Sequence, residues 1–400
     1  MATLLFIVIS FVFVGLGLPD SLFGAAWPDI YSDLNLPISY ANYVTTLISV
    51  GTVLSSLFAS QLVAKLGTGK VAALSTLLTT IMLLIFSLGD NIIFFCLLSI
   101  PLGLGAGAID AALNNYVALN YSSTHMSFMH CFYGVGVSAS PLLMALALAK
   151  TDSWQGGYHI VATIMATITL VGFLALPLWK KVKNKTQEKQ EKQVEQKPKS
   201  VFTLAKMPAV RVAWVVFFFT VALEFTCGIW GCTYLVQVEK MSESLAAATL
   251  TFYYIGITSG RAVSGVISKW INPQKIIFLG YGVVGLALVI LFLPIPATFK
   301  GVALFMIGFG NGPTFPNLTF LTPRYFGQDM SASVIATQTA CCNIGILLMP
   351  PVFGFLAEWL GVEIFPICLA VLYAIMVIST IIYAKRTRDL ITNKEKSKNC

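Results

Sequence analysis

The sequence predicts an all-α membrane protein with twelve transmembrane helices in two pseudo-symmetric six-helix bundles. Three observations indicate this fold class: a very apolar composition, a series of apolar segments long enough to cross a bilayer, and an internal duplication. Hydrophobic residues make up 57% of the 400 residues and charged residues only 10%, whereas a soluble domain carries about 25% charged residues. The composition therefore indicates that most of the chain lies in lipid.

Apolar segments of about 20 residues, the length that crosses a bilayer, follow one another along the chain. In hydrocarbon each backbone amide must be satisfied within its own segment, so segments of this length are helices. The predicted spans are 3–27, 41–63, 71–89, 92–118, 126–149, 157–179, 209–237, 245–267, 275–293, 298–320, 330–356 and 361–384. We expect the first to be a span rather than a secretory signal, because no basic residue precedes it.

Two near-copies of one pattern lie about 205 residues apart. Gly-Leu-Gly-Ala-Gly at 103–107 recurs as Gly-Phe-Gly-Asn-Gly at 308–312, and Asp20 matches Glu224 at an offset of 204. Glycines four residues apart on a membrane helix predict close helix packing. Duplication in so apolar a chain is typical of secondary transporters.

The duplication sets the predicted domain boundaries. We place the N-terminal bundle at 1–179 and the C-terminal bundle at 208–384. The stretch 180–207 is rich in Lys, Glu and Gln with almost no apolar content, which predicts a solvated linker. Residues 385–400 are predicted to form a polar tail, and a duplicated chain that supplies both bundles favours a monomer.

Lysine and arginine gather on one side of the predicted membrane. With an even number of spans the termini share this side, which carries Lys65, Lys70, 180–211, Lys269, Lys275, Arg324 and the tail after Lys385. By the positive-inside rule this side is cytoplasmic. We therefore expect a multi-pass protein of the plasma membrane with both termini cytoplasmic. The net charge of +8 reflects this topology and does not indicate a nucleic-acid partner.

No motif in the sequence indicates catalysis or metal binding. Cys341 and Cys342 are adjacent, and the three histidines are not paired at helical spacing, so no metal-ligand pattern appears. The phosphate-binding pattern GxxxxGK[ST] is also absent, which argues against ATP-driven transport by this chain. Because no nucleophile and base can be assembled from its motifs, we expect no enzyme activity. We also expect no cofactor other than a coupling ion.

Three carboxylates lie within the predicted spans: Asp20, Asp110 and Glu224. Placing a charge at membrane depth costs at least about 2.5 kcal/mol, so such residues usually face a cavity and have a function. No lysine or arginine in the spans is an obvious partner for them. A carboxylate without a cationic partner takes up a proton readily in a low dielectric, which is the property that a proton-coupled carrier needs.

Helical spacing predicts the neighbours of two of these acids. Asn114, at i+4 from Asp110, points the same way. Trp27, at i+7 from Asp20, offers a ring face to a sugar, although its position also suits the aromatic belt of the membrane interface. His130 and Tyr133 share a face of the span 126–149. A single histidine of this kind is either a packing residue or part of the site.

The second half supplies further candidates for binding a solute: Glu224, Trp230, Gln338 and Asn343. Amides and carboxylates beside aromatic rings match the hydroxyl groups and apolar faces of a polyhydroxylated ligand. We therefore include these four residues in the predicted binding site.

A cytoplasmic gate is predicted from three basic residues. Arg261 follows Gly260 near the inner end of the span 245–267, and Lys65 and Lys269 lie in short polar breaks on the cytoplasmic side. The Arg261 side chain could equally extend its charged end to lipid phosphate.

The sequence resembles the major facilitator superfamily over its whole length, and within it the fucose:proton symporter family and its glucose-transporting relatives. The motifs that carry the resemblance are Gly-Leu-Pro-Asp at 17–20 with Trp27 and Pro28, Ile-Asp-Ala-Ala-Leu-Asn-Asn at 109–115, His-Cys-Phe-Tyr-Gly-Val-Gly at 130–136, Glu224 with Gly228 and Trp230, and Gly260 with Arg261. In two places the chain departs from the family pattern. In the fourth span the family pattern has Glu where this chain has Asp110. The loop after the second span keeps the basic residue, Lys65, and the glycine, Gly67, of the superfamily pattern but lacks its acidic residue.

The resemblance implies the major facilitator fold and assigns roles to particular residues. In that family an acid in the first helix and another in the fourth are associated with proton coupling and sugar binding. Those roles map onto Asp20 and Asp110, with Asn114 as a contact for a sugar hydroxyl.

We therefore predict a secondary active transporter that works by alternating access. Its expected activity is proton-coupled symport of a sugar or related polyol, with lipid as its other partner. A proton is favoured over sodium as the coupling ion because the acids are single and scattered, whereas a metal cation needs several converging oxygens.

Two other functions fit the sequence in part. A proton-coupled exporter of drugs or metabolites would share the acids and differ in ligand and direction. A membrane receptor or scaffold without transport activity would need no ionisable cavity, so the acids within the spans argue against it.

Overall fold

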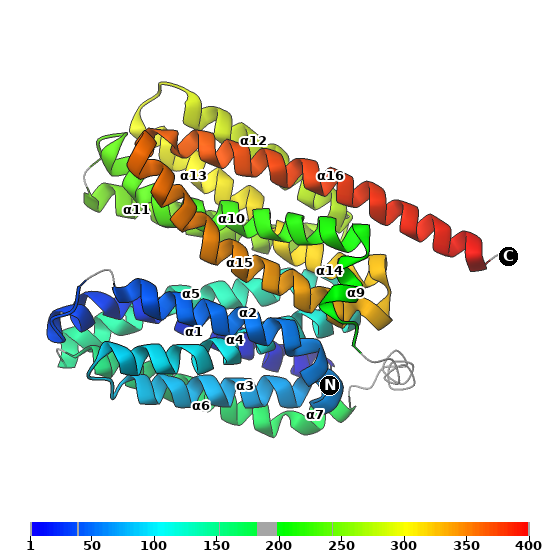
Figure 1. Cartoon of the computed structure of the whole chain (residues 1–400), viewed down its shortest axis with the longest axis horizontal. Coiled ribbons are helices and arrows are strands. Elements are labelled where there is room, and N and C mark those ends of the chain that lie inside the picture. The colour runs from blue at the N-terminus through cyan, green and yellow to red at the C-terminus, as the bar shows by residue number, and fades with distance from the viewer. Residues whose placement is uncertain (1, 38–39, 152, 182–197, 242, 399–400) are drawn as a thin grey trace. The chain divides into compact units, whose positions relative to one another are not determined.

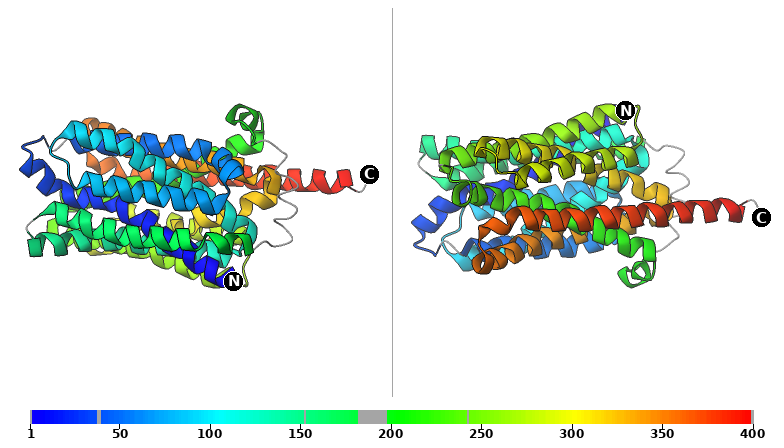
Figure 2. Two further views of the ribbon diagram at one scale, coloured as in Figure 1. Left: turned by 90° about the horizontal axis from the view of Figure 1, so that it is seen from below. Right: turned by 90° about the horizontal axis from the view of Figure 1, so that it is seen from above.

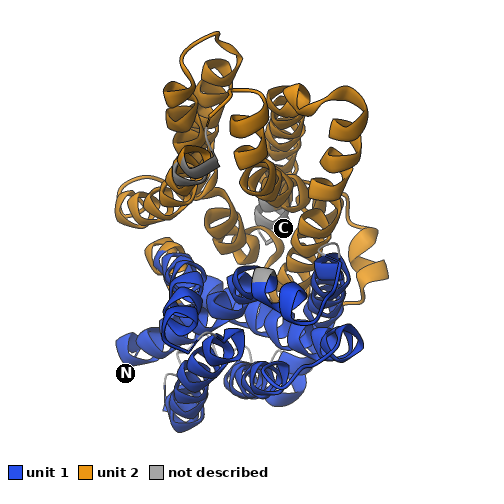
Figure 3. Ribbon diagram, turned by 90° about the vertical axis from the view of Figure 1, so that its left-hand side faces the viewer, with its two compact units in different colours: residues 1–120, 128–198 blue, residues 121–127, 199–400 orange. Residues whose placement is uncertain are grey.

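The computed structural model describes residues 2–37, 40–151, 153–181, 198–241 and 243–398. These residues form helices joined by short connections (Figure 1), so the predicted all-α class is confirmed. The chain divides into two compact units (Figure 3). One contains residues 1–120 and 128–198, and the other contains residues 121–127 and 199–400.

The helices that begin before the linker are α1 (Ala2–Asp33), α2 (Ala41–Leu66), α3 (Thr68–Phe86), α4 (Ile92–Asn120), α5 (Ser123–Thr151), α6 (Trp154–Leu174) and α7 (Leu176–Lys181). In the first unit α2 packs along α4, α3 lies against α4 and α6, and α1 lies against α6. The predicted span 157–179 is interrupted at Ala175, where α6 ends.

The second unit contains α9 (Val201–Ala205), α10 (Pro208–Gln237), α11 (Glu243–Ile267), α12 (Pro273–Phe292), α13 (Ala297–Asn311), α14 (Thr314–Phe326), α15 (Gln328–Leu360), a 3-10 turn (Val362–Ile364) and α16 (Phe365–Lys398). Most of the predicted linker 180–207 lies outside the described residues, and its end includes α9. The predicted tail 385–400 continues α16 as helix to Lys398, past the end of the neighbouring α12 (Figures 1 and 2).

The duplicated glycines form two matching seams, one in each unit. A Cβ atom at Gly103 would overlap the carbonyl oxygen of Ile48, which shows that α4 and α2 approach through their backbones. In the second unit a Cβ atom at Gly308 would overlap the carbonyl oxygen of Tyr253 on α11. The close packing predicted from the glycine spacing is therefore confirmed in both halves.

The predicted span 298–320 is broken into α13 and α14, which have 15 and 13 residues. Pro313 and Pro316 lack the amide hydrogens that a continuous helix would use here. Ten of the described helices are long and apolar enough to cross a membrane. The predicted spans outside that group are α13 with α14, which the break shortens, and α11, whose hydroxyl side chains and Arg261 lower its hydropathy.

Large apolar side chains are exposed on the outside of both units. Phe58 and Leu97 are 59% and 69% exposed in the first unit, and Phe355 is 69% exposed in the second. Exposed apolar side chains of this size are expected where helices contact lipid.

Candidate functional site

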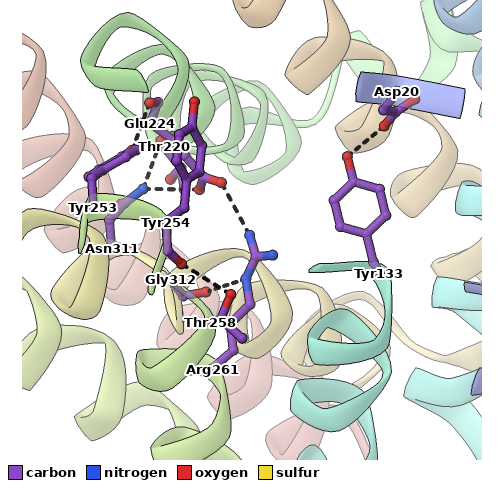
Figure 4. A network of polar contacts seen from close by, with 10 residues as sticks. All are labelled: Asp20, Tyr133, Thr220, Glu224, Tyr253, Tyr254, Thr258, Arg261, Asn311 and Gly312. Atoms are coloured by element: carbon purple, nitrogen blue, oxygen red, sulfur yellow. Dashed lines mark hydrogen bonds and ion pairs between the residues drawn. The ribbon is translucent and has the colours of Figure 1, made fainter. Parts of the chain in front are cut away.

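Asp20 lies on α1 beside α5, and two glycines explain how the helices come so close. A Cβ atom at Gly17 would overlap the carbonyl oxygen of Tyr133, and one at Gly136 would overlap that of Val14. This crossing brings the Tyr133 hydroxyl to Oδ2 of Asp20, to which it donates at 2.5 Å (Figure 4). The Asp20 side chain is exposed in the structure, so the pair is within reach of a solute.

A second polar chain joins α4 to α5. Asn114 donates from Nδ2 to Oδ1 of Asp110 at 2.8 Å, and its Oδ1 lies 3.0 Å from Nε2 of His130. Asn114 is fully buried and His130 is 6% exposed. Since Asn114 presents its amide hydrogens to the carboxylate, its oxygen accepts and the Nε2 atom of His130 carries the hydrogen. The carboxylate of Asp110, the amide of Asn114 and the imidazole of His130 are thus joined in one chain of hydrogen bonds between α4 and α5.

The acid of the second unit has a different partner. Glu224 on α10 forms an ion pair with Arg261 on α11, with 3.2 Å between Oε1 and Nη2 (Figure 4). Asn311 on α13 donates to Oε2 of the same carboxylate at 3.3 Å and to the carbonyl of Thr220 at 3.2 Å. The expectation that none of the three acids has a basic partner is therefore wrong for Glu224.

The other predicted solute contacts in the second unit have partners of their own. Trp230 donates to the carbonyl of Pro350 at 2.9 Å, and Asn343 donates to the carbonyl of Thr339 at 3.0 Å. Gln338 is fully buried and accepts from the Thr322 hydroxyl at 3.0 Å. None of these three hydrogen bonds involves Glu224.

Trp27 and the three predicted gate residues lie in different surroundings. Trp27 is 6% exposed and packs between Phe23 and Tyr31 on its own helix, with ring centroids 5.2 and 6.1 Å away. Lys65 is exposed in the last turn of α2 and Lys269 is exposed in the turn after α11, whereas Arg261 is buried within its unit. Of the three gate residues, two thus lie at helix ends and one lies inside a bundle.

Sequence reasoning missed two features of the second unit. Tyr253 donates its hydroxyl to the carbonyl of Glu224 at 2.7 Å, and Arg261 donates from Nε to the carbonyl of Gly312 at 3.3 Å. The sequence contained a signal for the bond to Gly312. Pro316, four residues later, cannot donate the helical hydrogen bond to the Gly312 carbonyl, which therefore needs another donor.

The side chains around Asp20 and Asp110 can exchange protons and can form hydrogen bonds with hydroxyl groups of a ligand. Within the described residues, no group of three or more His, Cys, Asp and Glu side chains is placed to hold a metal ion. A groove of about 350 Å³ between α2 and α4 is lined by apolar side chains such as Leu47 and Ile100 and contains no predicted site residue. The polar clusters around Asp20 and Asp110 therefore remain the candidate site in the first unit.

Comparison with known families identifies the class of protein. The family profile described as Major Facilitator Superfamily matches residues 6–348. Helical bundles with acids inside long apolar helices fit a membrane transporter, and this match covers most of the chain. The chain belongs to the Major Facilitator Superfamily.

Curated relatives are distant. The chain is 22% identical to Bypass of stop codon protein 6 of Saccharomyces cerevisiae, over 94% of this chain and 81% of that protein. It is 23% identical to the glucose/mannose transporter GlcP of Bacillus subtilis, over 50% of this chain and 51% of that protein. The second alignment thus spans only about half of each chain.

Solved structures share the fold. The E. coli fucose:proton symporter FucP superposes with a TM-score of 0.72 at 16% identity, over 94% of this chain and 98% of that one. The proton:xylose symporter XylE, bound to 6-bromo-6-deoxy-D-glucose, superposes with a TM-score of 0.74 at 11% identity, over 95% and 94% of the two chains. The predicted all-α major facilitator fold is thereby confirmed, whereas the predicted count of twelve spans is not. At these identities the likeness shows the fold alone.

Proposed function

We propose that this transporter carries a sugar or related polyol by proton-coupled symport, through alternating access of its two bundles. The observation that carries the proposal is the environment of the first-unit carboxylates. Asp110 and Asp20 are hydrogen-bonded by neutral groups, Asn114 and Tyr133. Neither forms an ion pair with a lysine or arginine among the residues that the structure describes.

In this proposal Asp110 is the main proton site. Ionised Asp110 accepts from the Asn114 amide, which also contacts His130. Protonation of the carboxyl group removes its charge and gives it a hydrogen to donate. A sugar hydroxyl then competes for Asp110 and Asn114, so binding of the proton and binding of the solute are linked through one amide.

Asp20 and Tyr133 form the second contact for the solute. The exposed carboxylate accepts hydrogen bonds, and the tyrosine ring adds an apolar face beside it. Sugars are bound by a few fixed polar groups together with aromatic rings. The names of the relatives support a sugar, since they include a glucose/mannose transporter and symporters for fucose and xylose.

The experiment that tests the proposal records external pH in lightly buffered suspensions of proteoliposomes, with hexoses and polyols added one at a time. We expect the medium to become alkaline on adding one of them, and expect the Asp110→Asn variant to give no response. Asp90→Asn is the matched control, because Asp90 is exposed in the connection between α3 and α4. Absence of a response to every sugar, with or without sodium, would contradict the proposal and favour export of amphipathic solutes.

A further inference from the structure

The break between α13 and α14 leaves two carbonyl groups without helical donors. In a continuous helix Phe309 would accept from residue 313 and Gly312 from residue 316, but both of those residues are proline. Proline has no amide hydrogen, and an unsatisfied carbonyl at membrane depth costs several kcal/mol. The break therefore requires donors from a neighbouring helix.

Consecutive residues of α11 lie against these two carbonyls. Arg261 donates from Nε to the Gly312 oxygen at 3.3 Å, and its side chain is 9% exposed. A Cβ atom at Gly260 would overlap the carbonyl oxygen of Phe309, so only a glycine lets the α11 backbone approach there. The pair Gly260–Arg261 thus fits the broken segment in both shape and hydrogen bonding.

The guanidinium group is held in place by Glu224. Its Nη2 lies 3.2 Å from Oε1, while Asn311, the last residue of α13, binds Oε2 at 3.3 Å (Figure 4). Asn311 also binds the carbonyl of Thr220, one turn before Glu224 on α10. The carboxylate therefore links three helices at the break.

We propose that Arg261 is a positioning residue that fixes the break between α13 and α14, and that Glu224 is its permanent counter-ion. The sequence suggested two other roles, a gate for Arg261 and a solute contact for Glu224. The geometry instead places the Arg261 guanidinium between the carbonyl of Gly312 and the carboxylate of Glu224. Since the pair is mutually neutralised, loss of either partner leaves an uncompensated charge inside the bundle.

Hydrogen exchange of the purified full-length protein tests this assignment without knowledge of the solute. In Glu224→Gln we expect the amides of 309–320 to exchange about tenfold faster, because the Arg261 donor is no longer held. In the double variant Glu224→Gln with Arg261→Gln the charge imbalance is gone, and a glutamine amide can donate to Gly312. We expect its exchange to return to within about twofold of the native rate.

Glu239→Gln is the matched control. Glu239 pairs with Lys300 at 3.6 Å in the same unit, so its loss removes an ion pair without touching Gly312. We expect no change at 309–320 in this variant. Unchanged exchange in Glu224→Gln, equal acceleration in the double variant, or acceleration spread over α16 as well would each overturn the proposal.

Discussion

Asp20 and Glu224 occupy matching positions in the two halves of the chain, yet their surroundings differ. Asp20 is exposed and accepts from Tyr133, whereas Glu224 is paired with Arg261 and bound by Asn311. The residues of the first half that match Arg261 and Asn311 by the same offsets are Leu57 and Ala106.

The difference indicates that acids at matching positions of two duplicated bundles can have different roles. In the first unit both acids, Asp20 and Asp110, have neutral hydrogen-bond partners. In the second unit the acid Glu224 is paired with a cation, Arg261. The proposals above place coupling in the first unit and fixed support in the second, and each prediction below tests that division.

The largest effect is expected for Asp110→Asn. The amide keeps the size of the side chain but cannot release a proton, so uphill accumulation of the solute should be lost completely. Exchange of labelled for unlabelled solute should continue, because it needs no net proton movement. Concentrative uptake and counterflow in the same proteoliposomes measure the two activities. Retained accumulation would place the proton site elsewhere.

Glu224→Gln should cost about 3 kcal/mol of stability, the lower range for breaking a buried ion pair. Thermal unfolding in detergent measures this, with Glu358→Gln as the control because Glu358 is exposed on α15. The double variant with Arg261→Gln should recover most of the loss and keep the proton dependence of transport. If the double variant lost proton dependence, Glu224 would belong to the coupling machinery and the comparison would fail.

Asn114→Ala should raise KM for the solute about tenfold, because a hydrogen bond to a charged group contributes about 1.5 kcal/mol. The change leaves both Asp110 and His130 without their shared partner. Asn120→Ala is the control: that amide, on the same helix, donates to the carbonyl of Tyr116 at 2.8 Å. Uptake rates over a range of solute concentrations separate KM from the maximal rate. Equal effects of the two substitutions would remove Asn114 from the site.

The smallest effect is expected for Tyr133→Phe, which deletes one hydroxyl and keeps the ring. The loss should be about 1 kcal/mol, or a few-fold in uptake rate, with uphill accumulation retained. Tyr43→Phe, on the exposed face of α2, should leave uptake unchanged. A complete loss in Tyr133→Phe would give this hydroxyl a larger role than a contact to Asp20.

The helices were predictable because hydrocarbon forces every apolar segment of sufficient length into a helix. The predicted span 41–63, for example, is α2 from Ala41 to Leu66. The broken span 298–320 was also predictable, since Pro313 and Pro316 remove backbone donors. The glycine seams followed from spacing on a single helix.

The ion pair of Glu224 and Arg261 could not be predicted in the same way. Its residues lie 37 positions apart, and helical periodicity relates only residues on one helix. Arg261 was placed near the inner end of its span, but a long side chain carries its charge well away from its Cα atom. Likewise, the burial of Gln338 against Thr322 depends on which face of α15 meets α14, which an apolar sequence does not specify.

The glycine seams have a mechanical consequence. Where Gly103 meets Ile48 and Gly308 meets Tyr253, backbone touches backbone with no side chain between. A seam of this kind has no side-chain rotamers that could adjust to a substitution, so any residue larger than glycine would push the two helices apart. The spacing of the helices at these crossings is therefore set by the smallest residue in the chain.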